Sequence, residues 1–284
     1  MNKYSQQFDI DEFIIKSFKE DIGNGDHTSL SCIPAEASGK AKLLVKQDGI
    51  ISGVDIAERV FFLIDQNIKF DKKISDGSSV KFGDIVFTVE GKAQSILQAE
   101  RLMLNIMQRM SGIATTTGFY VKLIEGTSAK ILDTRKTTPG MRYFEKLAVL
   151  HGGGNNHRFG LFDMIMIKDN HIDYAGSIKN AITKTKEYLK ENNLDLKIEV
   201  EARNFQEIEE IMQTGGIHRI MIDNFSVEDC KKAVEMISCK YETEASGGIN
   251  EKTIRDYALT GVDFISVGAL THQIKSLDLS LKAY

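Results

Sequence analysis

The feature that most constrains the fold of this 284-residue chain is a repeated alternation of short apolar runs with longer amphipathic segments. Six apolar runs follow one another from about residue 128: "AKILD", "DMIMIK", "KIEVE", "RIMID", "YETEA" and "DFISV". The segments between them, such as "NFQEIEEIMQT", have helical length, and the pairs Asn204/Glu207 and Ser226/Asp229 have the spacing of helix N-caps. Strands that alternate with helices predict a parallel sheet, and six or more such units predict a closed or nearly closed α/β barrel.

Residues 1 to about 112 have a different pattern, which predicts a separate N-terminal domain. An amphipathic helix is expected over 10–20, and short alternating strands follow in "KAKLLVK", "NIKF" and "DIVFTVEG". A second helix is expected over 95–110. Its apolar side is predicted to consist of Ile96, Met103, Met107 and Met110, and its polar side of Gln98, Arg101, Asn105 and Gln108.

Composition excludes several classes of protein. The chain has 36 Lys and Arg against 40 Asp and Glu and a pI near 5.9, which argues against a nucleic-acid partner. Cys32, Cys230 and Cys239 lack CxxC spacing, which favours reduced thiols over disulfides or a zinc site. The N-terminus has no signal-peptide core, and no segment approaches the roughly 20 apolar residues of a membrane span. We therefore expect a cytoplasmic protein without a membrane partner.

Polar residues and glycines stand where the predicted barrel strands end. These positions are Arg135 and Lys136, Lys168, Glu201, Asp223, Ser246 to Gly248, and Gly268. Loops that follow the strands of an α/β barrel converge at one rim, where the chemistry of such proteins takes place. Because charges are rarely buried without partners, this recurrence predicts a ligand site rather than packing.

The cationic residues predict an anion site. In isolation, His157 would be a structural histidine, but near Arg135, Lys136 and Lys168 it becomes part of a cationic pocket. A Schiff-base role for Lys168 or Lys136 is conceivable, although the arginines suit planar carboxylate or phosphate recognition better. The pattern alone places Arg101 among solvated helix residues.

Glycine-bearing and acidic strand ends extend this prediction. "ASGGIN" and "SVGALT" are each expected between a strand and a helix, where amide groups can bind a phosphate. Glu201 and Asp223 can hold Mg²⁺ or accept hydrogen bonds from sugar hydroxyls. The residues thus predict small, multiply anionic ligands, at least one of them phosphorylated, without choosing the reaction.

A set of motifs in this chain resembles one known family nearly end to end. The motifs are "EDIGNGDHTS", "AERLMLNIMQRMSGIAT", "DTRKTTPGMR", "EKLAVLHGGGNNHRFGLFDMIMIKDNHI", "EVEARN", "MIDNF", "EASGGI" and "SVGALTH". They resemble the nicotinate-nucleotide pyrophosphorylase (carboxylating) family, also called quinolinate phosphoribosyltransferase. The resemblance implies an N-terminal α/β sandwich-like domain, residues 1–112, and an incomplete α/β barrel of about seven units, residues 113–274, that carries the active site. We expect the tail 275–284 to pack back on the first domain.

The resemblance also implies an activity and an assembly. The family is a pentosyltransferase that converts quinolinate and phosphoribosyl pyrophosphate (PRPP) to nicotinate mononucleotide, pyrophosphate and CO₂ in NAD biosynthesis, with Mg²⁺. It implies a homodimer in which Arg101 reaches the partner's site. The implied quinolinate pocket consists of Arg101, Arg135, His157, Arg158 and Lys168, and the implied PRPP and Mg²⁺ residues are Lys136, Thr137, Glu201, Asp223, Ser246, Gly247, Gly248, Gly268, Ala269, Leu270 and His272.

Two other functions are consistent with the same scaffold. A paralogue could transfer phosphoribose to another pyridine or base, as in molybdenum-transport-associated relatives, but the intact "IKDNH" and "NHR" argue against it. A non-catalytic anion-binding protein would not need Glu201 and Asp223. Turnover of quinolinate with PRPP separates these possibilities.

Overall fold

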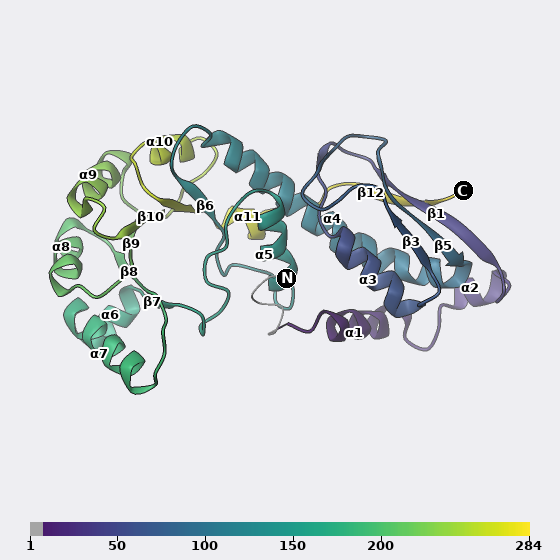
Figure 1. Ribbon diagram of the computed structural model, residues 1–284, viewed down its shortest axis with the longest axis horizontal. Helices are drawn as coiled ribbons and strands as arrows, with labels where there is room; N and C mark the ends of the chain where they lie inside the picture. Colours follow the sequence, from purple (N-terminus) through teal and green to yellow (C-terminus); the bar gives the residue numbers. More distant parts are fainter. Residues whose placement is uncertain (1–7) are drawn as a thin grey trace. The chain divides into compact units, whose positions relative to one another are not determined.

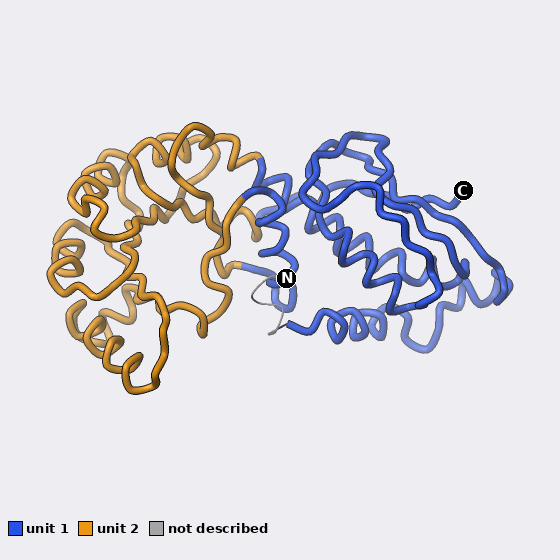
Figure 2. The backbone as a smooth tube through the Cα atoms, viewed as in Figure 1, with its two compact units in different colours: residues 1–118, 137–153, 273–284 blue, residues 119–136, 154–272 orange. Residues whose placement is uncertain are grey.

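The computed structural model describes residues 8–284, and the first seven residues of the expected N-terminal domain lie outside this part. The chain forms two compact units, coloured separately in Figure 2. Unit 1 runs to Gly118 and also includes Thr137–Gly153 and Gln273–Tyr284, whereas unit 2 comprises Phe119–Lys136 and Gly154–His272. Over residues 8–284, no helix combines the length and the apolar character that crossing a membrane requires.

Unit 1 contains a four-stranded antiparallel sheet in the order β12-β1-β5-β3 (Figure 1). Its strands are β1 (Ser38–Val45), β3 (Lys69–Lys72), β5 (Ile85–Lys92) and β12 (Leu279–Ala283), and a separate pair joins β2 (Gly49–Ile50) to β4 (Ser79–Val80). The three strands expected from the alternating pattern are therefore confirmed. The chain's last strand lies beside β1, with Leu43 opposite Leu281.

The helices of unit 1 cover its apolar residues. They are α1 (Ile10–Ile22), α2 (His27–Cys32), α3 (Val54–Ile64), α5 (Arg142–His151) and most of α4 (Ala93–Leu123). The predicted apolar face of α4 is confirmed, because Met103, Met107 and Met110 are fully buried whereas Arg101 is exposed. The helix continues beyond the expected end at Met110 because the apolar positions Ile113, Ala114 and Tyr120 extend its buried face.

Unit 2 is built on six parallel strands in the order β6-β11-β10-β9-β8-β7. They are β6 (Lys130–Leu132), β7 (Ile165–Ile167), β8 (Ile198–Ala202), β9 (Arg219–Asp223), β10 (Glu242–Ser246) and β11 (Phe264–Ser266), so each strand predicted from an apolar run is confirmed. Within the described chain β6 and β7 are both edge strands, which makes the barrel incomplete. The resemblance implies about seven units. Beyond the six strands, Asn155 adds one isolated bridge to Leu132.

Helices connect these strands and lie along the outer side of the curved sheet (Figure 1). They are α6 (Asp169–Ala175), α7 (Ile178–Glu191), α8 (Phe205–Thr214), α9 (Val227–Ile237) and α10 (Ile254–Ala258), and a further short helix, α11 (Ala269–His272), follows β11. The two predicted N-caps are confirmed: the side chain of Asn204 accepts from the amide of Glu207, and that of Ser226 accepts from the amide of Asp229.

Candidate active site

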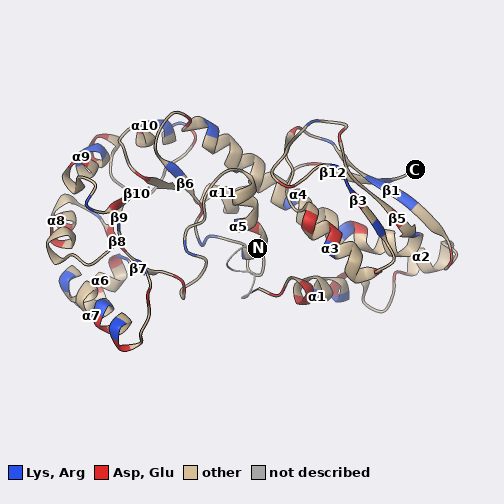
Figure 3. Ribbon diagram, in the orientation of Figure 1, with Lys and Arg blue, Asp and Glu red and all other residues tan. Residues whose placement is uncertain are grey.

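The register of the parallel strands brings their carboxyl ends to one rim of unit 2. Ser246 of β10 lies opposite Asp223 of β9, and Ser266 of β11 lies opposite Leu132 of β6. Side chains alternate between the two faces of a strand, so Glu199 and Glu201 of β8 share one face. Figure 3 shows acidic residues along β8 to β10.

Asp133 joins the two segments that carry the predicted arginines. It is fully buried, and its carboxylate accepts from the amide of His157 at 2.8 Å and from Nδ2 of Asn156 at 2.6 Å. The amide of Asp133 in turn donates to the carbonyl of Asn155. The segment after β6 and the segment 155–158 are therefore held side by side at the rim.

Arg135 and Arg158 come together on these joined segments. Burial lowers the pKa of Arg158, and the positive charge of Arg135 lowers it further. Nη1 of Arg158 donates to the carbonyl of Met164 at 3.2 Å, while the buried Nε of Arg135 has no hydrogen-bond partner among the described residues. Two half-buried cations that repel each other are stabilised when an anion binds between them.

Lys136 lies against the end of β11. The hydroxyl of Thr271, which is fully buried, donates to the carbonyl of Lys136 at 2.8 Å. A Cβ added at Gly268 would lie 2.9 Å from Nε2 of His272 and 3.3 Å from Cδ of Lys136. Because residue 268 is glycine, the side chains of Lys136 and His272 can lie close to the backbone of the motif "SVGALTH".

Glu201 and Asp223 form the acidic part of the rim, and Lys168 lies beside Glu201. Glu201 is buried, with Oε2 at 3.6 Å from Nζ of Lys168. Burial raises the pKa of Glu201, Lys168 opposes this, and the nearby charge of Asp223 raises the pKa further. The carboxylates of Glu201 and Asp223 repel each other, and a cation between them would relieve this repulsion. Carboxylate oxygens are the hard ligands that Mg²⁺ prefers, so Glu201 and Asp223 fit that ion.

The glycines after β10 bring the backbone close to the end of β9. Gly247 and Gly248 have φ of +97° and +62°, and a Cβ added at Gly247 would overlap the side-chain oxygen of Asn224. The amide of Asn224 also donates to the carbonyl of Ser246 at 2.9 Å. The helix expected directly after these glycines starts only at Ile254, because 250–253 first form a turn that the amide of Thr253 closes by donating to the carbonyl of Asn250. By contrast, α11 follows Gly268 directly but has a single turn.

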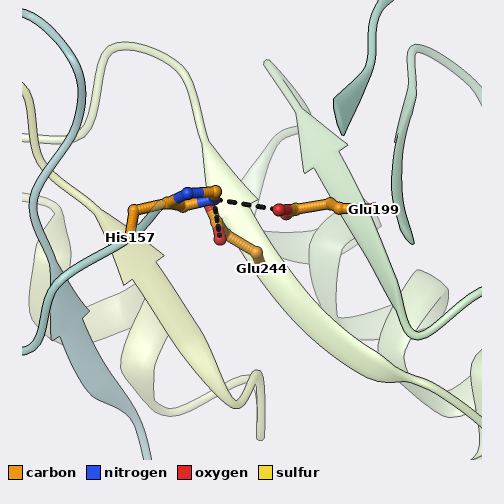
Figure 4. Close-up of side chains that lie close together, drawn as sticks. All are labelled: His157, Glu199 and Glu244. Carbon is orange, nitrogen blue, oxygen red and sulfur yellow. Dashed lines mark ion pairs between the residues drawn. The ribbon is translucent and has the colours of Figure 1, made fainter. Parts of the chain in front are cut away.

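The structure places His157 inside the barrel, facing away from open solvent (Figure 4). Its Nε2 lies 2.9 Å from Oε2 of Glu199 and 3.3 Å from Oε2 of Glu244, and the backbone nitrogen of Arg158 lies 2.6 Å from its Nδ1. Burial lowers the pKa of His157, but hydrogen bonds to the two carboxylates outweigh this and raise the pKa to about 9. Both ring nitrogens thus face protein groups.

Sequence reasoning missed the buried acids and the arginine that accompanies them. Glu199 and Glu244 are fully buried, and Nη1 of Arg219 lies 2.9 Å from Oε2 of Glu244 and 4.0 Å from Oε2 of Glu199. The signal was present in "IEVE" and "ETEAS", in which an acid lies two residues before the polar strand end. Because the period of a strand is two, that acid faces the same interior one layer deeper.

Two predicted site residues belong to unit 1. Arg101 is exposed on α4, and the hydroxyl of Thr137 accepts from Nε of Arg142 at 2.9 Å. The other predicted residues belong to unit 2. Unit 2 thus brings together the rim residues themselves, namely Arg135, Lys136, Arg158, Lys168, Glu201, Asp223, Ser246 to Gly248, Gly268 to Leu270 and His272.

These features define a class of protein: an incomplete parallel α/β barrel that binds small polyanionic ligands at its strand ends. The family models "Quinolinate phosphoribosyl transferase, N-terminal domain" and "Quinolinate phosphoribosyl transferase, C-terminal domain" match residues 26–111 and 113–282. The chain belongs to the quinolinate phosphoribosyltransferase family.

Similarity to individual proteins extends over almost the whole chain. A chloroplastic nicotinate-nucleotide pyrophosphorylase (carboxylating) of Arabidopsis thaliana is 44% identical, over 97% of this chain and 83% of that protein. A probable nicotinate-nucleotide pyrophosphorylase (carboxylating) of Bacillus subtilis is 42% identical, over 93% of this chain and 90% of that protein. The structure of the nicotinate-nucleotide pyrophosphorylase from Francisella tularensis superposes with a TM-score of 0.91 at 41% identity, covering 97% of this chain and 96% of that one.

Proposed function

We propose that this chain is a decarboxylating phosphoribosyltransferase that joins quinolinate to PRPP and yields nicotinate mononucleotide, pyrophosphate and CO₂, a step of NAD biosynthesis. Its family and relatives that bear this activity in their names support the reaction. The observation that carries the substrate is the pair of half-buried guanidinium groups of Arg135 and Arg158, in which the charge of Arg135 adds to burial in lowering the pKa of Arg158. Quinolinate presents two adjacent carboxylates, and charge-assisted bonds to such a pair neutralise both partners.

The two substrates take different parts of the rim. Arg135, Arg158 and Lys168 would hold the diacid, and Arg101 would complete the pocket from a partner subunit. Backbone amides of 246–248 and 268–270 would bind the phosphates of PRPP, next to Lys136 and His272. Thr137 follows Lys136 on the same segment and would contribute to the PRPP side.

Glu201 and Asp223 have the donor set for Mg²⁺, directly or through water and ribose hydroxyls. When bound, the ion would stabilise the negative charge that develops on departing pyrophosphate. The remaining chemistry needs alignment and charge. The pyridine nitrogen bonds to the anomeric carbon as pyrophosphate leaves, and the quaternised ring then loses the neighbouring carboxylate as CO₂. Lys136, Glu201 and Asp223 are the residues placed closest to the reacting ribose in this scheme, which uses no covalent nucleophile.

We further propose a cytoplasmic homodimer in which each subunit completes the partner's site with Arg101. Exposure of Arg101 on α4 leaves its guanidinium available for such an exchange. The relatives differ in compartment, since the Arabidopsis protein is named chloroplastic.

Incubating the chain with quinolinate, PRPP and Mg²⁺ tests the proposal. CO₂ and pyrophosphate should appear in equal amounts, and chelation of Mg²⁺ should stop both. Binding of quinolinate without turnover would favour an anion-binding protein, and turnover of a different pyridine in preference to quinolinate would favour a paralogue. The Arg135→Ala variant should bind quinolinate more weakly, with a loss of about 2–5 kcal/mol in binding free energy, and should still bind PRPP.

A further inference from the structure

A buried acid of unit 1 is bonded to the segment that the proposed function assigns to PRPP. Glu145 lies in the first turn of α5, and its side chain is fully buried. The amide of Thr138 donates to its Oε2 at 3.2 Å. Arg109 of α4 reaches its Oε1 with Nε at 2.8 Å and with Nη2 at 2.7 Å. Since acids are rarely buried without partners, Glu145 depends on both contacts, and all three residues belong to unit 1.

Glu145 and Arg109 together hold Thr138 at two points. Glu145 accepts from the backbone amide of Thr138, and Nη2 of Arg109 donates to the hydroxyl of Thr138 at 2.8 Å. Arg109 has a firm support, because Met107 and Met110 beside it on α4 are fully buried. Contacts with both the backbone and the side chain of one turn residue go beyond what the packing of α4 against α5 requires.

Thr138 ends a short segment whose start is fixed separately. At the start, the buried carboxylate of Asp133 accepts hydrogen bonds of its own. Arg135 follows Asp133 by two residues, so this end supports the side chain proposed for quinolinate. Lys136 and Thr137 directly precede Thr138, so the other end supports the two side chains proposed for PRPP.

We propose that Glu145 is a positioning residue for PRPP: together with Arg109 it fixes Thr138, and it thereby sets the position of Lys136 and Thr137 in the PRPP site. This inference rests on the proposed function, which assigns Lys136 and Thr137 to PRPP. Because Glu145 is fully buried, it acts through Thr138 and not by touching the substrate.

Glu145→Gln tests the hold on the amide of Thr138. Gln has one acceptor oxygen, and the guanidinium of Arg109 takes it because charged donors form the stronger hydrogen bonds, so the amino group of Gln faces the amide of Thr138. We expect KM for PRPP to rise about tenfold, while KM for quinolinate stays within about twofold. Asp11→Asn is the matched control. It makes the same acid-to-amide change in another arginine–carboxylate pair of unit 1, Asp11 with Arg59, and should leave both KM values unchanged.

Two results with Glu145→Gln would overturn the proposal. One is an unchanged KM for PRPP, which would mean that the segment keeps its position without the acid. The other is a rise in KM for quinolinate as large as the rise for PRPP, which would mean that the substitution disturbs the fold and not one end of the segment.

A second pair of variants tests the hold on the hydroxyl, and it decides if Glu145→Gln does not fold. Thr138→Val removes the hydroxyl, and Arg109→Lys keeps a cation beside Glu145 but loses the planar fork that reaches Thr138. Each variant should raise KM for PRPP about three- to fivefold, and the double variant should be no worse than either alone. Effects that multiply in the double variant, or single variants with the wild-type KM, would refute the inference.

The inference can fail separately from the reaction. A wild type that does not turn over quinolinate with PRPP refutes the proposed function. The hold on Thr138 is then measured in the ligand-free protein by amide hydrogen exchange. Exchange at Thr138 should be about tenfold faster in Glu145→Gln than in the wild type, and it should be unchanged at Asn155, whose amide donates to the carbonyl of Ile131 in unit 2. Equal exchange at Thr138 in both proteins would refute the positioning role even in an active enzyme.

Discussion

Replacing Thr271 with valine tests how the end of β11 holds Lys136. The hydroxyl of Thr271 donates to the carbonyl of Lys136 at 2.8 Å and to that of Gly268 at 3.3 Å, and the side chain is fully buried. Valine has nearly the same shape but no donor, so the carbonyl of Lys136 loses this hydrogen bond, which lies in a part-buried site. A hydrogen bond of this kind contributes about 0.5–1.5 kcal/mol net. If this loss falls on the arrangement that binds PRPP, kcat/KM for PRPP should fall roughly 2- to 13-fold.

The assay is initial rate against PRPP concentration at saturating quinolinate, with thermal unfolding in parallel. Thr271→Ser is the matched control, because it restores the donor and removes only a methyl group, so it should recover most of the lost kcat/KM. Two results would refute the reasoning. One is a valine variant with wild-type kcat/KM, and the other is a serine variant as impaired as valine, which would assign the effect to the methyl group.

Three further predictions concern the glycine turn, the buried histidine and the shared site. Gly247→Ala should cost about 1–3 kcal/mol and raise KM for PRPP, because residue 247 has φ of +97° and the side-chain oxygen of Asn224 occupies the position of the added Cβ. Gly248→Ala, whose added Cβ meets no described atom within 4 Å, should show the smaller effect of strain alone. The folded pKa of His157, about 9, exceeds its unfolded value near 6.5, so its contribution to stability is complete below about pH 6.5 and is lost as the pH rises through 9. Urea midpoints from pH 6 to 10 should therefore decline in the wild type and decline less in His157→Gln; parallel curves would contradict this. Mixed dimers of Arg101→Ala and Arg135→Ala chains should regain part of the activity that either variant lacks, and verified heterodimers without activity would exclude a shared site.

Local sequence patterns predicted much of this molecule. Apolar runs identified all six strands of unit 2, and residues such as Lys168 and Asp223 could be placed at strand ends from their position alone. These features follow from periodicities of two and 3.6, which act over a few neighbouring residues. The motifs then identified the family, because they occur in the order and spacing of that family over nearly the whole chain.

What only the tertiary structure decided is which of these residues meet. His157 has the same neighbours in the sequence whether it faces a ligand or the barrel interior, and it is the packing of β8 and β10 that brings Glu199 and Glu244 to its ring. Thr271 and Lys136 are 135 positions apart in the chain, yet one hydrogen bond joins them. Strand order and register create such pairs, and both depend on the free energy of packing the whole sheet, which no short segment contains.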